Sequence, residues 1–168
     1  INSAYNGRLE QVLREYQTET AIVLLGTRLP KRYVPRDGKK KVDVHTSARK
    51  EWHHNEHWYI ISWGYSGGRY TNKATGVIIA IKPYLLKILH TRYDPPYAVE
   101  GRLAGLRFRG RTEDFFIGGF YAQQETEHPE YRHAVWTAFN TMMQTIPARS
   151  IKLVHSDCNG DPLPDNIT

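Results

Sequence analysis

Cysteine is almost absent from this sequence, which has 168 residues and a single thiol at Cys158. One cysteine cannot form a disulfide within the chain, which excludes the small disulfide-stabilised class of secreted domains. No apolar run approaches the roughly 18 residues that a membrane-spanning helix needs, and the polar residues after Ile1 predict no secretory signal peptide. Repeats and low-complexity tracts are absent too. With 40% hydrophobic and 24% charged residues, the chain is expected to form one globular domain without a membrane partner.

The net charge of +6 is concentrated in one short segment. Between Lys31 and Lys50 there are eight cations and two acids, whereas the 15 cations and 15 acids elsewhere cancel. A basic segment on a neutral body favours a phosphate-rich partner, because binding to nucleic acid releases condensed counterions. A solvated loop without a partner is the alternative. The candidate nucleic-acid-binding side chains are those of Arg32, Arg36, Lys39, Lys40 and Lys41.

Hydrophobic periodicity predicts two helices and several strands. Leu9, Val12, Leu13 and Tyr16 have the spacing of a helix with one buried face, and a second stripe predicts a helix from Pro129 to Thr145. Buried strands are predicted at 21–25, 77–81 and 151–155, a further strand at 58–63, and a hairpin at 103–108 and 115–120. Loops are predicted at 26–57, 64–76 and 82–101. This order of elements indicates an α/β (α+β) fold in which helices pack on mixed sheets.

Several sequence blocks, in order, carry a resemblance to a known family. An apolar strand leads into Gly26-Thr-Arg, and Ser66-Gly-Gly precedes Gly76-Val-Ile-Ile-Ala-Ile. Further on, Arg102-Leu-Ala-Gly-Leu-Arg is followed by Phe116-Ile-Gly-Gly-Phe-Tyr-Ala, and Ile151-Lys-Leu-Val-His leads into Ser-Asp-Cys-Asn-Gly. In these blocks the chain resembles the exonuclease–endonuclease–phosphatase family, which includes deoxyribonuclease I, abasic-site endonucleases and retroelement endonucleases. The resemblance implies a partial four-layer α/β sandwich with mixed sheets and helices packed outside. It also implies one incomplete domain over 1–168, without the family's first strand and C-terminal third.

The resemblance also implies a chemistry. The family hydrolyses phosphoesters with Mg²⁺, which neutralises the phosphate while an activated water attacks. By resemblance, Asp157 would orient or deprotonate this water, Asn159 would bind a phosphoryl oxygen, and Tyr121 would contact the phosphate. A turn at 157–160 and simple packing of Tyr121 are the alternatives. Thr27 stands where the family has its metal-binding glutamate, so retention of Mg²⁺ is doubtful and we assign no metal ligand.

These features predict a degenerate or truncated metal-dependent phosphodiesterase of the endonuclease type that acts on or binds nucleic acid, DNA rather than RNA. A non-catalytic nucleic-acid-binding module and a phosphatase-like relative acting on small phosphoesters are the alternatives. His53 and His57 have an i, i+4 spacing that could bind Zn²⁺ on a helix. No HExxH glutamate or nearby cysteine accompanies them, which favours exposed loop histidines. Cys158 is interpreted as a small buried apolar residue rather than a nucleophile.

Overall fold

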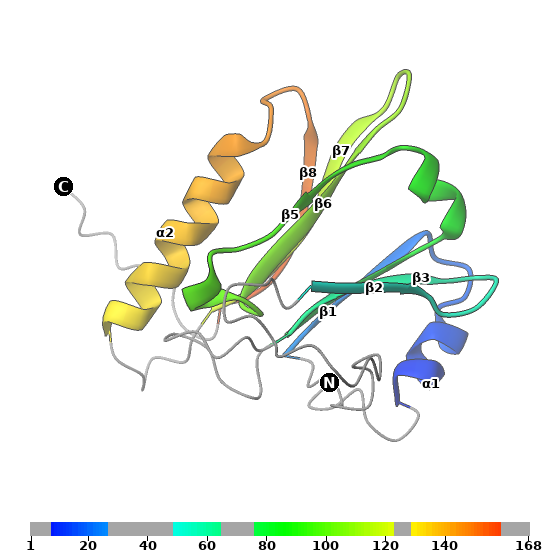
Figure 1. Ribbon diagram of the computed structural model, residues 1–168, viewed down its shortest axis with the longest axis horizontal. Helices are drawn as coiled ribbons and strands as arrows, with labels where there is room; N and C mark the ends of the chain where they lie inside the picture. The colour runs from blue at the N-terminus through cyan, green and yellow to red at the C-terminus, as the bar shows by residue number, and fades with distance from the viewer. Residues whose placement is uncertain (1–7, 27–48, 65–75, 123–128, 159–168) are drawn as a thin grey trace, which may run out of the picture.

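The computed structural model describes residues 8–26, 49–64, 76–122 and 129–158. Within these ranges the chain forms two α-helices and eight strands, and the strands make two four-stranded sheets. Figure 1 shows the strands of the two sheets crossing, with one helix outside each sheet.

Sheet A is antiparallel throughout and has the strand order β1, β4, β3, β2. Its strands are β1 (Ala21–Leu25), β2 (Arg49–His53), β3 (Tyr59–Trp63) and β4 (Val77–Ile81). The β-branched and aromatic residues of β3 and β4 favour extended structure, and all five residues of β4 are buried. These two central strands therefore form the apolar middle of the sheet.

Sheet B is mixed and has the strand order β5, β6, β7, β8. Its strands are β5 (Leu89–Tyr93), β6 (Leu103–Arg109), β7 (Asp114–Tyr121) and β8 (Ile151–Asp157). The predicted hairpin is confirmed, since β6 and β7 are antiparallel and in register from Leu103 opposite Phe120 to Arg109 opposite Asp114. β8 runs parallel to β7, because α2 (Pro129–Thr145) makes the crossover between them.

Three apolar clusters hold the layers together. Side chains of both sheets, including Trp63 and Phe108, meet in a central cluster. α1 (Arg8–Glu15) buries Leu13 against the outer face of sheet A, and α2 buries Val135 against the outer face of sheet B. The layers run helix, sheet, sheet, helix (Figure 1). The predicted α+β fold, with helices packed outside the sheets, is confirmed.

Two of the predicted loops contain regular structure, so those predictions are wrong. β2 lies inside the 26–57 loop, and β5 lies inside the 82–101 loop together with the 3₁₀ helices η2 (Pro83–Lys87) and η3 (Tyr97–Val99). β2 has no apolar run, and within the described ranges it lies at the edge of sheet A, with charges paired across the sandwich. Its Glu51 accepts two hydrogen bonds, each 2.7 Å long, from Arg92 of β5.

The prediction that residues 151–155 form a buried strand is also wrong. The segment is a strand, β8, but Ile151 is 66% exposed and Leu153 is 57% exposed. Within the described ranges β8 pairs with β7 on one side and lies at the edge of sheet B. An apolar sequence predicts burial, but it does not say whether a neighbouring strand is there to provide it.

Candidate functional site at the ends of three strands

The end of β1 lies against the end of β7, where Gly119 allows a close approach. A Cβ added at Gly119 would lie 2.7 Å from Val77 Cγ1 and 2.9 Å from Leu25 Cδ2. Tyr121 comes two residues after Gly119 on β7. A Cβ added at Gly26 would lie 3.8 Å from Cζ of Tyr121. Gly26 has a φ of 65°, a left-handed conformation that favours glycine. Gly26, directly after β1, therefore lies beside the ring of Tyr121.

Tyr121 and Asp157 are neighbours across sheet B. They lie opposite each other in the parallel register of β7 and β8, and the N–H of Ala122 donates to the carbonyl oxygen of Asp157 at 2.8 Å. Alternate residues share a face of a sheet. Phe115 and Ile117 are on the same face of β7 as Tyr121, and both pack against the central cluster. Tyr121 therefore projects inward, between the two sheets. Two of the predicted catalytic residues thus lie side by side, with Tyr121 half-buried and Asp157 exposed; their role stays a prediction.

A buried arginine, which the sequence analysis missed, completes this row. Arg102 is 2% exposed, and its guanidinium carbon lies 5.2 Å from the centroid of the Tyr121 ring, an attractive placement for a cation. Its carbonyl oxygen accepts a 2.7 Å hydrogen bond from the N–H of Tyr121. In the sequence, the glycine before it, Gly101, could have indicated a turn at this position. Gly101 has a φ of 87°, and the chain turns there into β6, opposite the end of β7. We call Arg102, Tyr121 and Asp157 the strand-end row.

The other predicted site residues lie outside the described ranges. They are Thr27, Asn159 and the basic residues Arg32, Arg36, Lys39, Lys40 and Lys41. In the sequence, Thr27 directly follows Gly26, and Asn159 comes two residues after Asp157.

The strand-end row does not by itself fit a magnesium ion. Mg²⁺ prefers an octahedral set of oxygen ligands, usually with one or two carboxylates. Asp157 offers one carboxylate, but the buried charge of Arg102 in the same row opposes a cation. Among the described residues, no three His, Cys, Asp or Glu side chains are grouped so that they could hold a metal ion.

The histidines that could have formed a zinc pair lie in different elements. His53 ends β2, so the loop position expected for it is wrong, and its ring lies edge-on to Tyr59 at a centroid distance of 4.8 Å. His57 is exposed in the turn before β3, and the intervening His54 contacts Glu10 of α1. Cys158 is half-buried and packs against the apolar cluster between α2 and sheet B. It is therefore less buried than expected.

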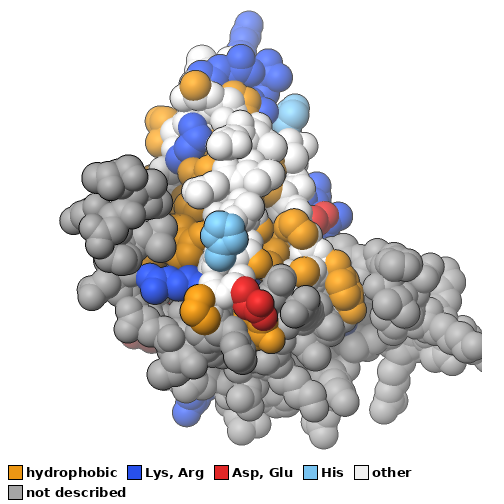
Figure 2. Space-filling model, turned by 90° about the vertical axis from the view of Figure 1, so that its left-hand side faces the viewer, with side chains coloured by type: hydrophobic (Ala, Val, Ile, Leu, Met, Phe, Trp, Pro, Cys, Tyr) orange, Lys and Arg blue, Asp and Glu red, His pale blue; other side chains and the backbone are white. Residues whose placement is uncertain are grey.

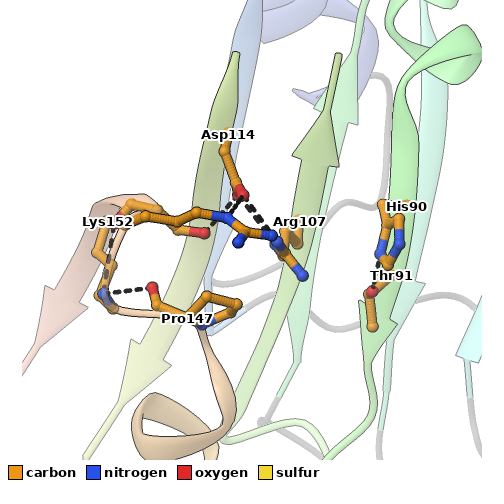
Figure 3. A network of polar contacts seen from close by, with 8 residues as sticks. His90, Thr91, Arg107, Asp114, Pro147 and Lys152 are labelled. Atoms are coloured by element: carbon orange, nitrogen blue, oxygen red, sulfur yellow. Dashed lines mark hydrogen bonds and ion pairs between the residues drawn. The ribbon is translucent and has the colours of Figure 1, made fainter. Parts of the chain in front are cut away.

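A polar network occupies the opposite end of β7 from the strand-end row. Figure 3 shows Arg107 and Asp114 pointing toward each other, with hydrogen bonds of 2.9 and 2.7 Å. Ser150 and Arg149 also donate to this carboxylate. The hydrogen bond from Arg107, followed by that from Ser150, holds the pKa of Asp114 far below its ordinary value. The network therefore joins β6, β7 and the α2–β8 connection.

An apolar groove of ≈ 1020 Å³ lies between α2 and the segment after β5. Figure 2 looks onto α2 and shows apolar side chains beside it. Pro95, Val99 and Met142 are among the residues that line the groove. It is on the outer side of sheet B, whereas the strand-end row projects inward, so the two are separate.

Comparisons with known proteins add no family: no protein-family model and no curated protein matches this chain. In the part of the chain that the structure describes, neither helix is long and apolar enough to cross a membrane.

Proposed function

We propose that the strand-end row binds a phosphate group of nucleic acid, and that the chain is a degenerate phosphodiesterase-like domain of the exonuclease–endonuclease–phosphatase type. One observation carries the proposal: Tyr121 and Asp157 lie opposite each other at the ends of two parallel strands, beside the end of β1. The sequence blocks selected these two residues, and β1, independently of their positions in the fold.

Each member of the strand-end row has chemistry that suits a phosphodiester. The hydroxyl of Tyr121 can donate a hydrogen bond to a phosphoryl oxygen. Asp157, which is exposed, can orient a water molecule or take its proton. Arg102 is permanently charged, and its guanidinium lies over the ring of Tyr121 in the same row. The row therefore offers a donor, a base and a compensating charge.

The family's Mg²⁺ would supply charge neutralisation at the phosphate. The described residues do not complete a set of metal ligands. The role proposed for the strand-end row is therefore phosphate binding by its own side chains.

We expect no Mg²⁺-dependent nuclease activity above background. A threonine hydroxyl at Thr27 cannot replace the negative charge of a metal-binding carboxylate, and groups of such a site act as a unit. The measurement is plasmid nicking in Mg²⁺ or Mn²⁺ by the parent chain and by Asp157→Ala. If the parent chain nicks the plasmid and Asp157→Ala does not, a working catalytic site survives and the expectation is wrong.

Phosphate binding is tested by fluorescence anisotropy with a labelled DNA duplex at low salt. Tyr121→Phe removes one hydrogen bond donor, and we expect it to weaken binding about ten- to a hundredfold, as the loss of a hydrogen bond to a charged group would. Arg111→Gln is the matched control for Arg102→Gln, because Arg111 is exposed in the β6–β7 turn, far from the row. The proposal fails if Tyr121→Phe and Arg102→Gln, both folded by circular dichroism, bind DNA no more weakly than Arg111→Gln.

A non-catalytic nucleic-acid-binding module is the second candidate, and the incomplete ligand set favours it. It predicts salt-dependent DNA binding that persists with EDTA. Loss of binding on metal removal would support a metal-dependent phosphodiesterase instead.

A further inference from the structure

The cations and acids outside the basic segment 31–50 cancel in number, but they are unevenly placed in the fold. At the end of sheet B that the Asp114 network occupies, the segments 83–91, 107–116 and 147–152 come together. These segments carry six cations and two acids. Figure 2 shows Lys and Arg side chains gathered at the top of the molecule, where Figure 1 has the β6–β7 hairpin. The fold therefore builds a second basic region that is not apparent from the sequence.

Four exposed cations form this region, and hydrogen bonds hold their segments together. The N–H of Arg109, the last residue of β6, donates to the carbonyl oxygen of Ile88 at 2.7 Å. Lys87, directly before Ile88, therefore lies beside the end of β6. Arg111 follows in the β6–β7 turn, and Arg149 donates to the carboxylate of the polar network at the start of β7. We call these four exposed side chains, Lys87, Arg109, Arg111 and Arg149, the basic tip.

Most of the charge of the basic tip is not neutralised within the described part of the chain. There, three of its four side chains, all except that of Arg149, make no hydrogen bond or ion pair. Arg149 shares the carboxylate of Asp114 with Arg107, so one negative charge faces two positive ones. Glu113 is the only exposed acid of the three segments, and it accepts a hydrogen bond from the hydroxyl of Thr112. The basic tip therefore attracts a partner that carries negative charges.

An exposed tyrosine beside the basic tip indicates the class of partner. Tyr84 is 59% exposed and comes three residues before Lys87 in η2, so the two side chains are on the same side of this 3₁₀ helix. Arginine and tyrosine are enriched where proteins bind proteins and lysine is depleted there, and three of the four cations are arginines. A nucleic-acid backbone would be neutralised by lysine as well. These features favour a protein partner.

The polar network shows how an arginine of this region binds a carboxylate. Arg107 donates two hydrogen bonds to Asp114, one to each carboxylate oxygen, and this bidentate geometry is characteristic of guanidinium with carboxylate. The exposed arginines of the basic tip can bind aspartate or glutamate side chains of another protein in the same way.

We propose that the basic tip binds an acidic segment of a partner protein, with carboxylates on the arginines and an apolar side chain on Tyr84. The tip lies at the opposite end of β7 from the strand-end row. The strand covers roughly 23 Å between Asp114 and Tyr121, so the two surfaces are separate. The proposal does not depend on the proposed function.

Fluorescence anisotropy with a labelled peptide of repeated Glu-Glu-Leu units tests the proposal, and a peptide of Gln-Gln-Leu units is its neutral counterpart. We expect the parent chain to bind the acidic peptide more tightly than the neutral one. Lys87→Gln, Arg109→Gln and Arg111→Gln together should weaken binding of the acidic peptide about three- to a hundredfold, as the loss of three exposed ion pairs would.

The matched control removes the same charge from the basic segment, by Lys39→Gln, Lys40→Gln and Lys41→Gln, and should keep more affinity for the acidic peptide than the tip variant does. Tyr84→Ser should weaken binding of this peptide and leave binding of a DNA duplex unchanged. Circular dichroism and thermal unfolding establish that each variant is folded.

Three results would overturn the proposal. The parent chain could bind the two peptides equally, or the two triple variants could lose equal affinity for the acidic peptide, which would mean unspecific attraction between charges. The tip variant could also lose more affinity for a DNA duplex than for the acidic peptide, which would identify the basic tip as a nucleic-acid surface.

Discussion

At the scale of single residues, Asp114 joins three chain segments through hydrogen bonds from Arg107, Arg149 and Ser150. Its pKa is lowered from an ordinary value of 3.8, so the folded state releases this proton more readily than the unfolded state does. The stabilisation is therefore complete above about pH 5 and is lost as the pH falls below the ordinary pKa.

We expect Asp114→Asn to lower the free energy of unfolding at neutral pH and to flatten its decline below about pH 4. Urea unfolding at a series of acidic pH values measures both effects. Glu19→Gln is the control, because Glu19 is exposed and belongs to no such network. A decline with pH as steep in Asp114→Asn as in the parent would contradict this role of the carboxylate.

A second prediction at this scale concerns Gly119. We expect Gly119→Ala to destabilise the fold by about 1–3 kcal/mol, the usual cost of overpacking. The new methyl group would come within 3.0 Å of side-chain atoms of both Val77 and Leu25. The midpoint of denaturant unfolding measures the effect, and an unchanged midpoint would show that β1 can move away from β7 freely.

At the scale of elements, α1 is bonded to a tryptophan that directly precedes β3. The indole N–H of Trp58 donates to the carbonyl oxygen of Leu13 at 3.0 Å, one of the last carbonyls of α1, which have no partner within the helix. We expect Trp58→Phe to lower the free energy of unfolding by about 1–3 kcal/mol through the lost hydrogen bond and ring volume.

The matched control for this change is Trp136→Phe. The indole N–H of Trp136 is buried and has no hydrogen-bond partner among the described residues, so this variant loses ring volume but no hydrogen bond that the structure describes. Calorimetric or denaturant unfolding compares the two. Equal destabilisation by both would mean that the bond to Leu13 contributes nothing measurable.

Elements that the sequence analysis identified share a regular apolar pattern, and those it missed do not. The stripe from Val135 to Ile146 predicts α2, which spans Pro129–Thr145 as expected. β2 was missed because its Arg-Lys-Glu run is stabilised by ion pairs with β5, such as Glu51 with Arg92. Tyr16 fits the stripe of the first helix, yet α1 ends at Glu15 and Tyr16 is 48% exposed.

At the scale of the whole molecule, the uneven charge predicts where nucleic-acid affinity resides. We expect Lys39→Gln, Lys40→Gln and Lys41→Gln together to weaken DNA binding and to lower the salt slope by roughly one for each phosphate that is no longer neutralised. Anisotropy titrations at several salt concentrations measure both. The matched control removes Lys87, Arg109 and Arg111, three exposed cations elsewhere. A larger loss of affinity in the control would contradict this assignment.

The sequence by itself determined the local pattern of this protein: both helices, the β6–β7 hairpin and the apolar strands follow from spacings within a few residues. It also selected Tyr121 and Asp157 as candidates. Only the tertiary structure decided that these two lie side by side, that Arg102 joins them, and that Ile151 and Leu153 are exposed in a strand at the edge of the described sheet. The reason is physical. Strand pairing joins residues far apart in the chain. The entropic cost of closing a loop rises only slowly with its length, so sequence separation does not predict which strands will pair.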